Sequence, residues 1–210
     1  MKLNAEKTKL FVINYSNNYQ FAPRVTIPGS AKPLEVVNTT KLVGVTLTSD
    51  LKFHKHVQTI VKKAYKKIWM LRRLKAFGVK DKDLLDIYIV QIRSGLEYCV
   101  PAWNSSLTEE DKNEIERVKK TALKIIYGET YTDYETSLDL SQLESLEERR
   151  KGLCKTFALK CTLNKNHRKL FKKNNNINLH HPTKYEVPFC RNERYKKSPI
   201  PYLIDLLNQD

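Results

Sequence analysis

Short apolar runs dominate the first fifty residues of the chain, whereas longer stretches with a helical period follow them. The runs are rich in β-branched and aromatic residues, as strands are. The sequence Pro28-Gly29-Ser30 is a turn signal, so the runs on either side of it predict a hairpin. Gly44 interrupts the last run, which indicates a bulge or the close approach of another backbone. The four runs are Leu10–Ile13, Val25–Ile27, Leu34–Val37 and Leu42–Leu47.

Residues 51–128 carry the three- and four-residue hydrophobic spacing of helices. The first helix is predicted over residues 54–77, and Gly78 follows it as helix C-termini favour. Its apolar residues fall on one face. They are Val57, Ile60, Val61, Ala64, Ile68 and Leu71.

Two more helices are predicted in the same region. The second starts near Asp81, a good N-cap, and ends before Pro101. The third opens at Thr108 with acidic residues in its first turn, where the helix dipole favours them, and stops at Gly128. Because the connections are short, we expect the three helices to pack as antiparallel neighbours.

The remaining residues are less regular. A fourth helix is predicted from a capping box at Ser141–Glu144 to about Leu163. The polar stretch Lys172–Asn176 and the Pro-rich segment 182–201 predict an extended or disordered tail, with a short helix over 202–207. The pattern as a whole predicts an α+β fold in four segments, which are 1–50, 51–128, 129–170 and 171–210.

The charge balance indicates a polyanionic partner. The 210 residues include 38 Lys and Arg against 23 Asp and Glu, a formal net charge of +15. Such a charge attracts DNA, RNA, acidic membranes and acidic proteins alike, so composition does not choose among them. No apolar run approaches the roughly 20 residues of a membrane-spanning helix. We therefore expect an intracellular protein, in nucleus or cytoplasm, without a membrane partner.

Cysteine and histidine positions do not predict a metal site. Cys154 and Cys161 lie seven residues apart, two turns along one helix face, which is too far for a disulfide and fits free thiols in a reducing compartment. The pair His54 and His56, and the run His180-His181 with Cys190, do not supply four zinc ligands at a recognised spacing.

The first predicted helix concentrates the positive charge. From Leu51 to Lys80 there are ten basic residues and no acidic one. The steps between Lys55, Lys62, Lys66 and Arg73 place them in a stripe beside the apolar face, where phosphate groups can bind. An ordinary solvated face is the alternative. Tyr65 and Trp69 can stack on bases, but we assign Trp69 to the core. The candidate nucleic-acid-binding residues are Lys55, Lys62, Lys63, Lys66, Lys67, Arg72 and Arg73.

Six segments follow one another in a recognisable order. They are Leu3–Thr8 before an apolar strand, Lys41–Val45, Leu51–Val57, Ile92–Tyr98 with Trp103 after it, Val118–Gly128 and Leu143–Arg150. This ordered set resembles the C-terminal part of reverse transcriptases from non-LTR (LINE-type, jockey-like) retrotransposons. Leu42 stands where the family usually has an aromatic residue, and Lys119 where it usually has Gln.

The resemblance implies a palm remnant in residues 1–50, with Lys41 and Gly44 at the primer grip, and a three-helix thumb in 51–128. A helical extension and a basic, flexible tail follow. A thumb of this kind tracks the backbone of a template–primer duplex, so the resemblance implies sequence-independent binding of an RNA or DNA duplex.

The catalytic residues of that family are missing from this sequence. The family polymerises DNA with magnesium ions held by Asp carboxylates, two of them adjacent in a Tyr-x-Asp-Asp turn. This sequence contains no adjacent pair of Asp, and we expect the turn to lie before Met1. We therefore predict a chain with no polymerase activity of its own and no cofactor. A decayed reading frame, a protein-interaction module and a polymerase with an upstream start stay open as alternatives, and so does the oligomeric state.

Overall fold

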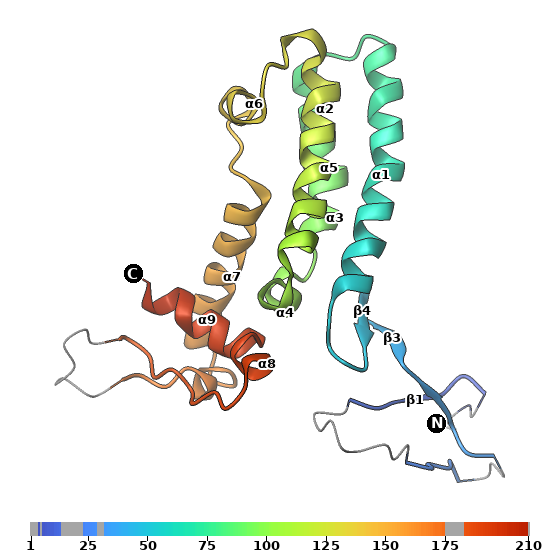
Figure 1. Cartoon of the computed structure of the whole chain (residues 1–210), viewed down its shortest axis with the longest axis vertical. Helices are drawn as coiled ribbons and strands as arrows, with labels where there is room; N and C mark the ends of the chain where they lie inside the picture. The colour runs from blue at the N-terminus through green and yellow to red at the C-terminus, as the bar shows by residue number, and fades with distance from the viewer. Residues whose placement is uncertain (1–3, 5, 14–22, 29–31, 175–182, 210) are drawn as a thin grey trace. The chain divides into compact units, whose positions relative to one another are not determined.

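The computed structural model describes residues 4, 6–13, 23–28, 32–174 and 183–209 (Figure 1). They form two compact units that divide between Gln58 and Thr59. The fold is mixed α+β, as the sequence predicted, and both two-stranded sheets of the described residues lie in the first unit. The unit boundary falls within a helix rather than between the strand-rich and helical segments.

The first unit contains a parallel strand pair that the sequence pattern did not reveal. Strand β1 (Lys9–Phe11) pairs with β2 (Glu35–Val37) in parallel register. The predicted hairpin between Val25–Ile27 and Leu34–Val37 is therefore wrong, although the Leu34 amide donates to the Val25 carbonyl at 2.8 Å. A turn signal depends only on neighbouring residues, whereas β2 pairs with a strand that lies more than twenty residues earlier in the sequence.

Gly44 lies in a tight turn and not in a bulge. Strand β3 (Thr39–Leu42) pairs antiparallel with β4 (Val45–Thr48). The two residues between them, Val43 and Gly44, have φ angles of 45° and 86°, which is the left-handed pair that a two-residue hairpin turn needs. The run predicted as one interrupted strand is therefore the two sides of a hairpin.

Helix α1 (His54–Ala76) matches the first predicted helix. Its apolar stripe is buried from Val57 to Leu71, with Val61 at the half-exposed margin. Gly78, with φ of 80°, lies just past its end and supplies the left-handed backbone that terminates a helix.

The second predicted helix is interrupted. It consists of α2 (Asp81–Ile87), a π-helical segment η1 (Tyr88–Arg93) and α3 (Ser94–Glu97). Asp81 is not the N-cap, because Lys80 holds that position and the Asp81 carboxylate instead pairs with Lys75 Nζ at 2.6 Å. Cys99, with φ of 57°, then turns the chain into α4 (Val100–Trp103) and the 3₁₀ segment η2 (Asn104–Ser106).

The third predicted helix is confirmed as α5 (Glu109–Tyr127). Thr108 and Asp111 form a reciprocal capping box at its start. Gly128, with φ of 54°, is its C-cap and opens the 3₁₀ segment η3 (Gly128–Thr130). In Figure 1, the axes of α1, α2 and α5 are roughly aligned, and the chain runs through α2 in the direction opposite to α1 and α5, as expected of antiparallel neighbours.

The predicted fourth helix is present but starts later than predicted, and a further helix that the sequence did not predict precedes it. Helix α6 (Tyr134–Ser141) ends where the predicted capping box begins, and α7 (Leu146–Leu163) starts after it. The actual capping box is the next Ser-x-x-Glu in the sequence, in which the Glu148 amide donates to Ser145 Oγ and the Ser145 amide donates to Glu148 Oε2, both at 3.1 Å. The Ser141 hydroxyl donates back to the Leu138 carbonyl at 2.9 Å.

Residues 175–182 of the predicted extended or disordered tail lie outside the described residues. Residues 183–192 contain no helix, as predicted, whereas the residues after them are more helical than the predicted 202–207. The described elements after α7 are η4 (Arg168–Leu170), α8 (Glu193–Lys196) and α9 (Pro199–Asn208). Helix α9 includes the predicted short helix and packs on α7 and α4 with Leu203, Ile204 and Leu207 buried. The Asn208 side chain accepts from the Tyr185 amide at 2.9 Å and donates to the Tyr185 carbonyl at 3.0 Å.

Buried and half-buried polar side chains join the helices of the second unit. The Glu116 carboxylate on α5 accepts from the first amide of α7, at Leu146, at 3.1 Å from each oxygen, and from the Tyr134 hydroxyl of α6. The Arg150 guanidinium donates through Nε to Asn104 Oδ1 at 3.0 Å, and Asn104 in turn donates to the Tyr202 hydroxyl of α9 at 2.9 Å. These bonds compensate for part of the desolvation that buried polar groups suffer.

Lys119 is the most unusual of the buried polar residues. Its side chain is 1% exposed and its ammonium donates to the Glu144 carbonyl. Burial lowers the pKa of Lys119 to about 8; Glu116 acts to raise this pKa and Arg93 to lower it. A cation in this position destabilises the folded state until it loses its proton.

The capping assignment predicts the effect of two serine substitutions. Ser145→Ala is expected to lower the free energy of unfolding by about 1 kcal/mol, because it removes the N-cap of α7. Ser141→Ala, the matched control, is expected to cost less, and urea denaturation measures both. A larger loss for Ser141→Ala would contradict the assignment.

Burial of Lys119 predicts a pH-dependent stability. The folded chain releases the Lys119 proton near its pKa of about 8, whereas the unfolded chain holds it up to the ordinary value of 10.5. Between these values the unfolded state binds more protons, so stability rises with pH. Compared with Lys119→Met, the wild type should gain about 1–2 kcal/mol between roughly pH 7 and 9.5. Lys160→Met, the exposed control, should show the same change in the free energy of unfolding with pH as the wild type. If the free energies of unfolding of the wild type and Lys119→Met change with pH in parallel, the effect is excluded.

Candidate nucleic-acid interface

The outer face of α1 is basic along most of its length in the second unit. Ile60, Ala64, Ile68 and Leu71 are buried. A position two residues further on is rotated by about 200° on an α-helix and therefore faces away from the core. The exposed residues Lys62, Lys66 and Arg73 occupy such positions, so the stripe lies opposite the apolar face. This corrects the prediction that the stripe lies beside that face.

The cations of α1 divide into two groups by what they contact. Lys67 donates to the Gln91 carbonyl of η1, and Lys75 donates to the Ile126 carbonyl of α5 at 2.6 Å besides pairing with Asp81. These two ammonium groups attach α1 to its neighbours. The other group is exposed to solvent.

The exposed group has no acidic partner within the described part of the chain. None of its members lies within 4.0 Å of a carboxylate there, because α1 itself contains no Asp or Glu and its neighbours direct theirs elsewhere. This set, called here the free cations, comprises Lys62, Lys63, Lys66, Arg72 and Arg73.

Aromatic rings lie among the free cations. Trp69 is 60% exposed, so its assignment to the core is wrong: it follows Ile68 by one position and is turned away from the buried stripe. The Arg73 guanidinium lies 5.2 Å from the Trp69 ring centroid and 5.7 Å from that of Phe77, both within cation–π distance. Phe77 is 74% exposed, and the sequence reasoning missed it.

The remaining candidate residues lie in the first unit. Lys55 is exposed, and its ammonium donates to the Thr39 hydroxyl of β3 at 3.2 Å. Lys41 is exposed on β3, and Gly44 lies in the β3–β4 turn. Of the seven predicted contacts, Lys67 is used in the packing of α1 against η1, and Lys55 lies in the part of α1 that belongs to the first unit.

The two described histidines of the first candidate pair, His54 and His56, have different surroundings. The His56 ring is buried and accepts from the Thr46 amide through Nδ1 at 3.3 Å, whereas the exposed His54 ring contacts Gln58. His180 and His181 lie outside the described residues. Over the part of the chain with described positions, no three His, Cys, Asp or Glu are grouped to hold a metal ion.

The cysteines carry free thiols. Cys154 and Cys161 lie on α7 two turns apart, as their spacing predicted, and both are buried. Burial raises the pKa of Cys154 to about 12 and also raises that of Cys161, so both thiols stay protonated at neutral pH.

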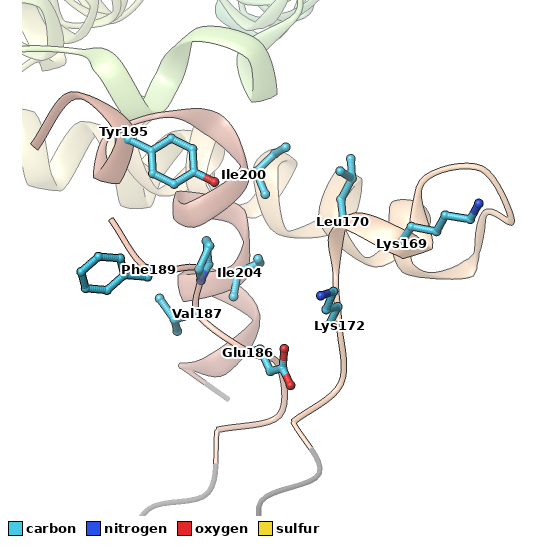
Figure 2. A pocket seen from close by; sticks show the side chains of 10 residues that line it. Lys169, Leu170, Lys172, Glu186, Val187, Phe189, Tyr195, Ile200 and Ile204 are labelled. Carbon is cyan, nitrogen blue, oxygen red and sulfur yellow. The ribbon is translucent and has the colours of Figure 1, made fainter. Parts of the chain in front are cut away.

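A separate pocket of about 400 Å³ opens in the C-terminal segment (Figure 2). Val187 and Ile204 lie on one side of it and Leu170 and Lys172 on the other. Its lining is apolar surface with a basic margin rather than a nucleophile beside a base. The polar lining residues are Lys169, Lys172, Glu186 and Tyr195.

Comparison of the chain with protein-family models, curated proteins and solved structures found no match. Within the described ranges, no helix is both long and apolar enough to cross a bilayer.

The β3–β4 turn predicts a stabilising substitution. A β-branched residue at positive φ is strained by its Cβ, so Val43→Asn is expected to stabilise the first unit by about 1 kcal/mol. Amide hydrogen exchange of Val45 to Thr48 measures this. Val36→Asn, on β2 with an ordinary strand conformation, should give no gain. Faster exchange in Val43→Asn would contradict the turn geometry.

Proposed function

We propose that this chain is a nucleic-acid-binding protein of reverse-transcriptase type that binds the backbone of a template–primer duplex and does not polymerise DNA by itself. The residues that carry binding are the free cations of α1. In this proposal, residues 1–50 correspond to the palm edge and residues 51–128 to the thumb.

The observation that carries the proposal is that all the free cations are exposed and that Lys62, Lys66 and Arg73 lie opposite the buried face of α1. Like charges one turn apart repel by a few tenths of a kcal/mol per pair. Surface helices usually relieve this with interleaved acidic residues, as α7 does with the pair Lys151 and Glu147 at 3.3 Å. On α1 no such residue is available, and a phosphate backbone supplies the missing negative charge.

The hairpin of β3 and β4 adds support from the first unit. By resemblance, Lys41 and Gly44 belong to the loop that holds the primer strand. Both residues lie on a tight hairpin, with Lys41 exposed and Gly44 in the turn. An exposed ammonium beside a narrow turn suits contact with a phosphate.

The proposal that this chain does not polymerise DNA by itself rests on the positions of the Asp residues in the sequence. The two-metal mechanism needs clustered carboxylates, and no two Asp are adjacent in these 210 residues. The residues present therefore do not fit the magnesium site of the resembled family, and no catalytic step is assigned to this chain. By the same proposal it acts inside the cell, in nucleus or cytoplasm.

Charge removal on α1 tests this function. The triple variant Lys62→Gln, Lys63→Gln, Lys66→Gln is expected to bind duplex DNA more weakly and to reduce the slope of log K against log salt by about 2–3, since each phosphate contact contributes roughly 0.9. Filter binding between about 50 and 200 mM salt measures both quantities.

The matched control removes the same charge elsewhere. Lys160, Lys165 and Lys169 are exposed near the end of α7, and their triple Gln variant should keep most of the wild-type slope. Equal losses in the two variants would mean that net charge, and not the face of α1, governs binding. Wild-type binding that does not respond to salt, or no binding, would refute the proposal.

A further inference from the structure

Two exposed aromatic rings lie among the free cations, Trp69 on the outer face of α1 and Phe77 directly after the last residue of that helix. Trp69 and Phe77 each lie four residues from Arg73, whose guanidinium contacts both rings. The order along the helix is therefore ring, cation, ring, with Lys62 and Lys66 in the turns before it.

The other tryptophan, Trp103, is packed in the core and serves as a comparison for Trp69. Trp103 is fully buried, and its Nε1–H donates to the Tyr98 carbonyl at 2.9 Å. Trp69 keeps 60% of its surface open even though Arg73 lies against it. Its ring is therefore not explained by packing within the second unit.

Cations alone are sufficient to bind a duplex backbone, because paired bases stay inside the double helix. Exposed rings interleaved with cations fit a different ligand. Proteins that hold single strands stack unpaired bases on aromatic side chains and place cations along the phosphates.

We propose that Trp69 and Phe77 are base-stacking residues and that the preferred ligand is a nucleic acid with unpaired bases, such as the single-stranded end of a template–primer duplex. This inference rests on the proposed function and specifies its substrate class. The two rings are separated by an axial rise of about 12 Å, the length of roughly three or four nucleotides in a stacked strand.

The test compares a blunt duplex with the same duplex carrying an overhang of about six nucleotides. Wild type should bind the overhang form more tightly. Trp69→Ala should weaken that binding about tenfold and blunt-duplex binding less than about twofold, with the salt slope unchanged. Phe77→Ala should act in the same direction. Phe189→Ala removes an even more exposed ring, from the C-terminal pocket, and should change neither affinity.

Tryptophan fluorescence distinguishes the loss of base stacking from the unfolding of a variant. A base that stacks on the Trp69 indole quenches its emission, whereas buried Trp103 stays as an internal reference. Trp69→Phe keeps an aromatic surface, so it should retain affinity within about threefold and lose the quenching.

The outcomes separate this inference from the function beneath it. If Trp69→Ala weakens blunt and overhang forms alike, or if wild type shows no preference, the stacking role is overturned while backbone binding stands. If wild type binds no nucleic acid in a salt-dependent way, both fail. Polyglutamate presents charge without bases; if it binds more tightly than the overhang form, both are likewise overturned in favour of an acidic protein partner.

Discussion

The apolar stripe of α1 is the constraint on which the basic face depends. Ile60, Ala64, Ile68 and Leu71 bury one side of the helix, and the helical period then determines the direction of every other side chain. Hydrophobic burial is worth about 1.5–3 kcal/mol for a large aliphatic side chain, far more than the repulsion between neighbouring lysines. The helix can therefore hold its cations in an array that they would not adopt alone.

Contacts with neighbouring segments then decide which cations remain available. Lys67 and Lys75 donate hydrogen bonds to backbone carbonyls of η1 and α5 and so hold α1 against these two segments. The free cations have no such acceptor nearby in the described chain. Basic residues of one helix therefore have two roles. Those that reach a neighbouring carbonyl stabilise the packing of α1, and those that stay exposed to solvent are the ones proposed to bind phosphate.

The second unit is completed by elements that the amino-acid pattern marks only weakly. Glu116 contacts both α6 and the start of α7, and Arg150 reaches Asn104, which contacts α9. These partners are separated by many residues in sequence, so no local spacing indicates them. The buried Lys119 belongs to the same set: a lysine in a helical pattern is ordinarily a surface residue, and only the surrounding helices make it a buried one.

Local physics let the sequence alone determine the extent of α1, the capping of α5 at Thr108, the buried stripe of α1, the excess of positive charge and the lack of adjacent Asp residues. Tertiary structure decided the parallel partner of β2, the choice of Ser145 over Ser141 as a cap, the exposure of Trp69 and the docking of α9. The reason is the range of the interactions. Periodicity and capping act within a few residues, whereas strand pairing, the choice between two equivalent local signals, and burial depend on segments that meet only in the folded chain.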